Sequence, residues 1–160
     1  MPELTLERAE PGRYVLGGLG TLRSGRRSTE IEAGGTAWKL RRGFGKTIKA
    51  SDTVSGAREA RYVPGGRLRM RGIYLGTIEL GDRELDWRAD HYMGEHFTVR
   101  ESGYVLAKFD AGTDARPVGV ALFGLEHLEA LPLLFCCHIV KCVVDMTMEA
   151  GSPGAPVEPR

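Results

Sequence analysis

The residues with the clearest chemical meaning in this sequence are cations gathered in one short stretch. Between Gly35 and Ala50 the chain has five cations and no acid. Alternate side chains of a β-strand point the same way, and a hairpin turn brings those of the next strand alongside. Such a cluster suits phosphate groups, since each Lys or Arg near an anionic surface contributes about 1 kcal/mol. This basic stretch consists of Lys39, Arg41, Arg42, Lys46 and Lys49.

A second set of cations alternates strictly with apolar residues further along the chain. Leu68 and Met70 are expected to point inward, and the arginines around them outward. Outward charges have a plainer interpretation, because they are solvated and protect strand edges from pairing with other chains. Both interpretations stay open for both sets of cations. The residues of this second row are Arg67, Arg69 and Arg71.

Ionisable groups also lie on a single face of the apolar segment near the C-terminus. At 100° per residue, the four ionisable groups of this segment fall in a stripe about 80° wide, and they are His138, Lys141, Asp145 and Glu149. Coupled ionisable groups on a buried helix have perturbed pKa values, and such groups mark pockets of enzymes or ligand-binding proteins. The sequence therefore offers a second candidate site, a pocket beside this helix stripe.

The remaining clusters predict no metal, cofactor or catalytic group. Cys142 could share a helix face with His138, but a zinc site needs three or four ligands. The thiols of Cys136, Cys137 and Cys142 are expected to be small hydrophobic core groups. Asp82, Glu84, Asp86 and Asp90 share one strand parity, yet the glycine-kinked loop of an EF-hand is missing. We expect no catalytic residue, no metal and no cofactor.

Short strands must position the cations. Trp38 and Leu40 alternate with Lys39 and Arg41, and comparable alternation recurs from residue 12 to residue 124. Gly-rich and Asp-rich breakers separate about eleven or twelve such segments, about ten residues apart. That spacing is typical of an all-β sandwich or barrel.

A helix is predicted over residues 131–149, with Pro132 in its first turn and Gly151 after its last. Most of its surface is apolar, so it should be surrounded on most sides. A membrane span is the rival interpretation, but about 20 apolar residues are needed to cross a bilayer, and Lys141 and Asp145 interrupt the run. A helix lying on a membrane is a third alternative. The Pro-rich residues 151–160 are expected to form a disordered tail.

Composition and charge limit the classes of function. The hydrophobic share is 42% and the charged share 27%, which excludes wholesale disorder. The net charge of +1 is uneven, since residues 11–73 carry +10 and residues 74–160 carry −7. This asymmetry is consistent with a basic face that binds an anionic partner, or with two halves of the chain whose charges neutralise each other across the folded surface. The clustered thiols and the absence of a secretory signal predict a cytoplasmic protein.

The order of these elements resembles the tubby C-terminal-like superfamily, which includes tubby domains, phospholipid scramblases and LURP-one-related proteins. The resemblance covers roughly residues 12–150. It rests on the strands 36–42, 97–100 and 104–110 and on the apolar run 131–148. It implies a mostly β fold, a closed antiparallel barrel of about 12 short strands around one central hydrophobic C-terminal helix. The domain would span residues 12–150 and leave 1–11 as an N-terminal segment.

For function, the resemblance implies a non-catalytic binding module, since tubby domains bind phosphoinositides through basic surface residues. We expect recognition of anionic phospholipid headgroups, or of a membrane surface to which the protein is peripheral. The alternatives are a small-ligand-binding barrel or enzyme at the helix stripe, and a scaffold for a protein partner. Nucleic acid is disfavoured, because the aromatic residues are expected to point into the core and not among the cations.

Overall fold

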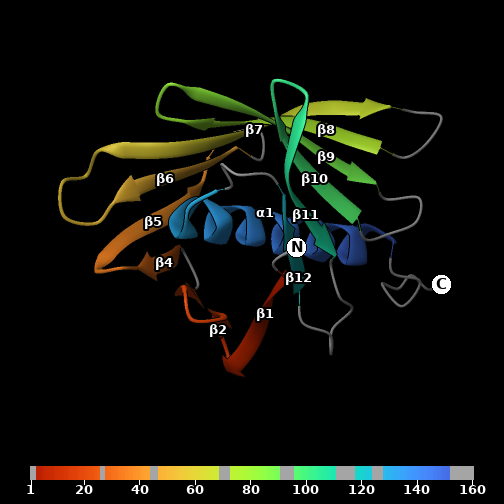
Figure 1. The fold of residues 1–160 in the computed structure, drawn as a ribbon. Coiled ribbons are helices and arrows are strands. Elements are labelled where there is room, and N and C mark those ends of the chain that lie inside the picture. The colour runs from red at the N-terminus through yellow and green to blue at the C-terminus, as the bar shows by residue number, and fades with distance from the viewer. Residues whose placement is uncertain are drawn as a thin grey trace.

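The computed structural model describes residues 3–25, 28–43, 47–68, 73–90, 96–110, 118–123 and 128–151. Twelve strands precede a single helix (Figure 1). In chain order they are β1 (Glu3–Glu10), β2 (Arg13–Leu16), β3 (Gly20–Ser24), β4 (Thr29–Ala33), β5 (Thr36–Arg42), β6 (Ile48–Asp52), β7 (Arg58–Leu68), β8 (Ile73–Leu80), β9 (Arg83–Asp90), β10 (His96–Glu101), β11 (Tyr104–Asp110), β12 (Val118–Leu122) and α1 (Ala130–Gly151).

The strands form a closed antiparallel barrel in which each strand pairs with the next along the chain. One long-range pairing closes it, between β1 and β12, with Leu6 opposite Val118. Closure removes the unpaired sheet edges on which other chains could add. The predicted closed barrel of about 12 strands around a C-terminal helix is confirmed.

The barrel begins earlier in the chain than the predicted boundary at residue 12. β1 lies within residues 1–11 and pairs with both β2 and β12, so this boundary is wrong. The alternation there is short, because Leu4 and Leu6 are the only large apolar residues of β1 and four of its eight residues are charged. β12, with which β1 pairs to close the barrel, lies at the other end of the barrel sequence. The predicted tail comprised residues 151–160. Its first residue, Gly151, is the last residue of α1, and residues 152–160 lie outside the described residues.

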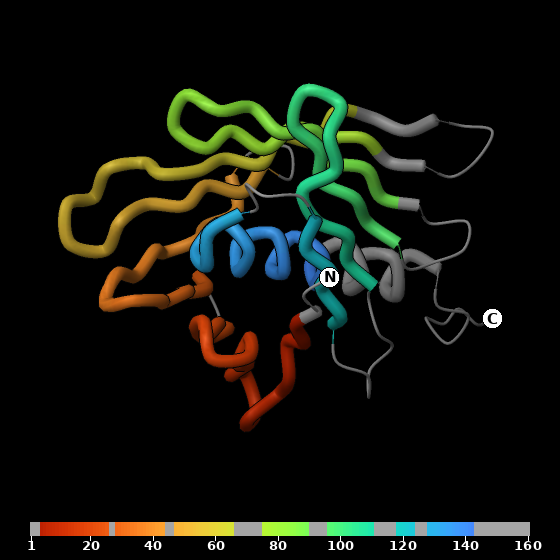
Figure 2. Tube along the Cα trace, viewed as in Figure 1, coloured from red at the N-terminus to blue at the C-terminus, as the bar shows by residue number. Residues whose placement is uncertain are grey.

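α1 runs through the barrel and fills its interior (Figures 1 and 2). The side chains from Leu133 to Cys137 are buried, as are those of Ile139, Val140 and Cys142. Gly20 of β3 makes a close approach to the helix possible. A Cβ atom at Gly20 would lie 2.8 Å from Leu134 Cδ1 and would also collide with the backbone carbonyl of Glu32. The prediction that this helix is surrounded on most sides is confirmed for those of its side chains that the structure describes.

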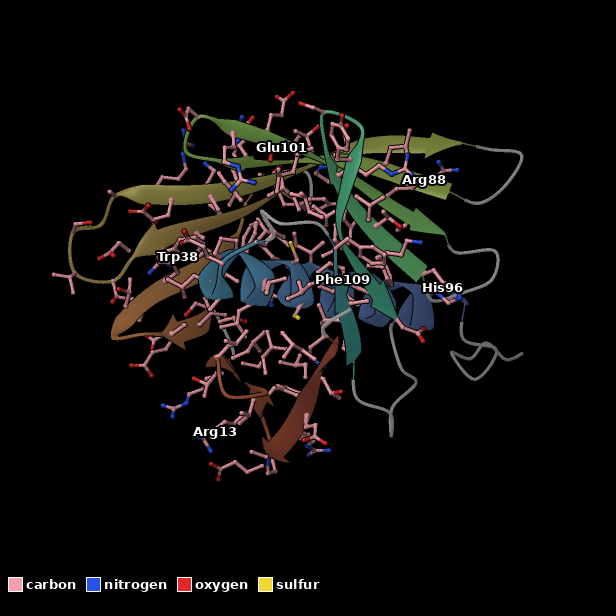
Figure 3. The ribbon with its side chains drawn as sticks, viewed as in Figure 1. Arg13, Trp38, Arg88, His96, Glu101 and Phe109 are labelled. Carbon is pink, nitrogen blue, oxygen red and sulfur yellow. The ribbon has the colours of Figure 1, made fainter. Side chains whose placement is uncertain are left out.

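The barrel wall contributes the other half of the core. The Trp87 ring lies 5.9 Å from the Tyr62 ring, 5.4 Å from that of Phe97 and 6.3 Å from that of Phe109, measured between centroids. Trp38 and Phe109 point into the barrel, while charged side chains such as Arg88 project outside it (Figure 3). The alternation of apolar and charged residues in the sequence therefore becomes an inside and an outside.

Candidate functional site

Three members of the basic stretch form an exposed cluster on the outer wall of the barrel. Lys39 and Arg41 alternate with the buried Trp38 and Leu40 on β5, so they face outward together. The β5–β6 register places Arg41 directly opposite Lys49. We call Lys39, Arg41 and Lys49 the outer cation cluster.

The cluster continues onto a third strand. Lys49 of β6 lies opposite Arg61 of β7. Arg61 has a bidentate ion pair with Glu79 of β8, with Nε–Oε1 and Nη2–Oε2 distances of 3.1 and 2.9 Å. Within the described residues, no ion pair is made by Arg41 or Lys49. Like charges directly opposite each other destabilise a sheet. In this row, Arg61 offsets part of the repulsion through its ion pair with Glu79.

Arg42 lies apart from the outer cation cluster. It is the last residue of β5 and has the same strand parity as the buried Trp38 and Leu40. Its charge helps to lower the pKa of His138, so it lies close to the helix stripe. Sequence reasoning assigned Arg42 to the basic stretch by position, whereas strand parity separates it. Of the other predicted cations, Lys46, Arg69 and Arg71 lie outside the described residues, as does the side chain of Arg67.

The helix stripe holds a thiol–imidazole pair. Cys142 Sγ lies 3.4 Å from His138 Nε2, across one turn of α1. Burial, with smaller contributions from the charges of Arg42 and Lys141, lowers the pKa of His138 to about 4. The imidazole is therefore neutral at physiological pH. Burial raises the pKa of the neighbouring Tyr62 to about 12, with a smaller contribution from Cys142.

Lys141 leaves the helix in another direction and finds an aromatic partner. Its Nζ lies 4.0 Å from the centroid of the Tyr14 ring of β2, which is a cation–π contact. The side chain of Asp145, the third predicted member of the stripe, lies outside the described residues. Lys141 thus contacts Tyr14 of the barrel wall, whereas His138 contacts Cys142 of the same helix.

The three thiols are buried and form no disulfide bond. Burial raises the pKa of Cys136 well above its ordinary value and that of Cys137 to about 12, the latter opposed by the charge of Lys141. Thiols held protonated in this way are poor nucleophiles. Within the part of the chain that is described, no three His, Cys, Asp or Glu side chains gather where a metal could be held. No helix among the described residues is long and apolar enough to cross a membrane.

A hollow in the surface is lined by none of the predicted cations or helix-stripe residues, but it includes Asp86 of the acidic strand row. It is lined by residues of β7 to β10, including Arg88 and Arg100, and has a volume of about 380 Å³. Strand alternation in the sequence could have placed each of these arginines outside the barrel. The register that makes them neighbours depends on the pairing of β9 with β10.

Neither a protein-family model, nor a curated protein, nor a solved structure matches this chain. The resemblance to the tubby C-terminal-like superfamily therefore stays a prediction.

Proposed function

We propose that the protein is a non-catalytic binding module that recognises anionic phospholipid headgroups through the outer cation cluster. The observation behind this proposal is the row formed by Arg41, Lys49 and Arg61 on three neighbouring strands. Directly opposed like charges are unfavourable in a sheet, and an anionic partner would relieve the repulsion.

The position of the cluster also supports this proposal. Lys39, Arg41 and Lys49 are all exposed. A barrel wall holds them in one surface, where a planar array of phosphates can meet several cations at once. About 1 kcal/mol per cation near an anionic membrane makes three cations worth about 3 kcal/mol, or more than a hundredfold in affinity. Salt weakens such an attraction, because exposed charges are screened.

A lipid surface fits the cluster better than a nucleic acid does. Proteins that bind single strands combine cations with aromatic side chains on which bases stack. Trp38, the aromatic residue that directly precedes Lys39 in sequence, is buried in the barrel. A labelled single-stranded oligonucleotide that bound more tightly than anionic vesicles would contradict the lipid assignment.

The test is sedimentation of the purified protein with vesicles of neutral lipid and with vesicles containing anionic lipid, at low and at physiological salt. We expect binding to the anionic vesicles only, weakened by salt. The triple variant Lys39→Gln, Arg41→Gln, Lys49→Gln should remain in the supernatant.

A matched control removes the same charge elsewhere on the barrel. Arg8, Arg23 and Lys108 are exposed on β1, β3 and β11. The variant Arg8→Gln, Arg23→Gln, Lys108→Gln should still pellet with anionic vesicles. If both triple variants lose binding equally, net charge and not the cluster is responsible. If neither loses it, the proposal is wrong.

A further inference from the structure

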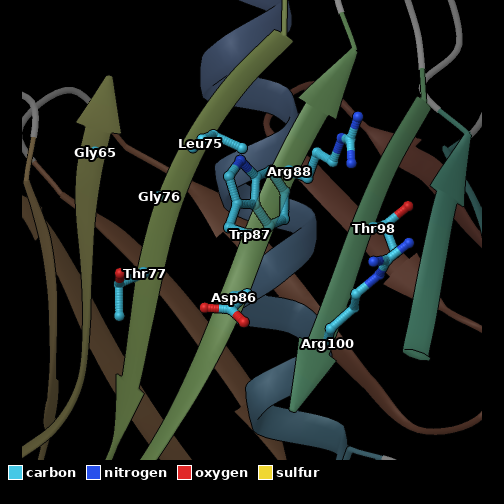
Figure 4. Close-up of a pocket in the computed structure, with 9 residues that line it drawn as sticks. All are labelled: Gly65, Leu75, Gly76, Thr77, Asp86, Trp87, Arg88, Thr98 and Arg100. Atoms are coloured by element: carbon cyan, nitrogen blue, oxygen red, sulfur yellow. The ribbon is translucent and has the colours of Figure 1, made fainter. Parts of the chain in front are cut away.

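The hollow on the outer wall lies over β8, β9 and β10 and has the size of a small-molecule site. Its volume is about 380 Å³, within the range of about 300–1,000 Å³ usual for ligand pockets. Leu75 of β8 and Arg88 of β9 are exposed at its surface, whereas Trp87, which precedes Arg88 on β9, is buried. Figure 4 shows the lining residues on these strands, with α1 behind them.

Two glycines on neighbouring strands line the hollow. Gly65 of β7 is exposed and lies at a register shift, where the strand has one extra residue against β8. Gly76 of β8 lies opposite the buried Trp87 of β9, and a Cβ atom there would point into the core, 2.8 Å from Cε1 of Tyr62. On the outer side the Cα atoms of both glycines and the exposed Leu75 therefore form an apolar floor.

Two guanidinium groups border this floor without an acidic partner. Arg88 of β9 lies opposite Thr98 of β10, and Arg100 follows two residues later on the same outward face. The Arg100 side chain extends along β10 toward Thr98, on the side of β9 to which Arg88 also points (Figure 4). Among the described side chains neither arginine has an ion pair. Two unpaired guanidiniums beside a hydroxyl form a site for a carboxylate or phosphate group.

Asp86 limits which anions fit. It lies opposite both Arg100 and Thr77, yet no ion pair joins it to Arg100, and its carboxylate points toward β8 (Figure 4). A carboxylate at this edge repels a second negative charge and accepts a hydrogen bond from a donor. The hollow therefore favours a small anion with one charged group over a polyanion.

We propose that this hollow binds a small organic anion, with its carboxylate or phosphate held by Arg88 and Arg100 and its apolar part over Gly76 and Leu75. The site is independent of the outer cation cluster, because it uses other strands and another class of ligand. Variants of Lys39, Arg41 and Lys49 should leave it unchanged, so the two proposals can fail separately.

The experiment records backbone amide NMR spectra of the full chain during titration with benzoate and with phenyl phosphate. We expect saturable shifts at Thr77, Arg88 and Thr98. Benzyl alcohol, which keeps the ring but not the charge, should leave these amides unmoved. Inorganic phosphate should bind about tenfold more weakly than phenyl phosphate, since it cannot use the apolar floor.

Three variants locate the site. Arg88→Gln and Arg100→Gln should each weaken binding about tenfold, because each removes a charge-assisted hydrogen bond. Gly65→Leu should block the hollow while keeping every charge. A Cβ atom at Gly65 meets nothing closer than 3.4 Å, and its backbone is not left-handed, so the fold should tolerate it.

The exposed Arg23 provides the control, and Arg23→Gln should bind both anions as the parent does. The absence of saturable shifts with either anion would overturn the proposal. If benzyl alcohol bound as tightly as the two anions, the arginines would not contribute to binding. If Gly65→Leu bound the anions as the parent does, the ligand would lie elsewhere. Because amide spectra report folding for every variant, loss of binding through unfolding is recognised directly.

Discussion

Protonation of His138 should destabilise the barrel in a defined pH range. The pKa of His138 is about 4 in the folded protein, against an ordinary value of 6.5. As the pH falls below 6.5, the His138 imidazole becomes protonated in the unfolded chain but stays neutral in the folded protein. The free energy of unfolding therefore decreases. The decrease is complete below pH 4, where both states are protonated, and amounts to about 3 kcal/mol.

The pH range from 7 to 5 isolates this effect. Over that range the two pKa values predict a loss of about 2 kcal/mol. The ion pairs of Glu79 and Glu101 persist over this range, because Arg61 and Arg83 lower the pKa of each carboxyl below its ordinary value of 4.5. Urea denaturation at pH 7 and pH 5 measures the free energy of unfolding for the parent and for His138→Gln. The variant should lose about 2 kcal/mol less than the parent between these pH values.

His96 provides the matched control, because its side chain is 64% exposed and pairs with Asp110 on the surface. His96→Gln should keep the pH dependence of the parent. If His138→Gln shows the same loss as the parent, then water reaches the imidazole in the folded state. The interpretation of His138 as a buried neutral group would then be refuted.

Three further predictions concern the packing of α1 in the barrel. Gly20→Ala should destabilise the protein by about 1–3 kcal/mol, because the new methyl group is overpacked against Leu134 and the β4 backbone. The control Gly18→Ala, where a Cβ meets nothing within 4 Å, should cost less than about 1 kcal/mol. Urea denaturation of both variants measures the two losses, and equal losses would contradict the close approach of Gly20 to the helix. Phe135→Ala should cost about 3–5 kcal/mol through the cavity it leaves in the barrel, and a loss below about 1 kcal/mol in the same measurement would mean that the helix is not enclosed. The three buried thiols should react with a thiol reagent such as DTNB only after denaturant is added, since burial raises the pKa of Cys136 and Cys137; rapid reaction of the native protein would show that the interior opens.

Local patterns in the sequence were enough to predict the strands and the helix. The alternation of Trp38 and Leu40 with Lys39 and Arg41 is a direct consequence of strand geometry, so the inward and outward sides followed without a structure. The apolar run after Pro132 likewise predicted a helix that is enclosed on most sides. β1 was missed because few of its residues are apolar and its partner β12 is remote in sequence.

Neighbours across strands could not be predicted in the same way. Strand parity assigns Arg41, Lys49 and Arg61 to the outside, but only the register places them in one row. Arg42 was predicted to belong with them because it is close to them in sequence, although its charge acts on His138. The hollow depends on pairing as well, because Gly76 must lie opposite Trp87 and Arg88 opposite Thr98.

Apart from β1, the sequence by itself thus determined which segments form strands, which forms the helix and which side of a strand is buried, because these properties depend on periodicities of a few residues. The tertiary structure decided the closure of the barrel by β1 and β12, the row of opposed cations, the environment of His138 and the hollow over β8 to β10. Each of these depends on strand register and on the position of α1. Register is fixed by the packing of the whole core, since a shift by one residue would turn every apolar side chain of a strand outward.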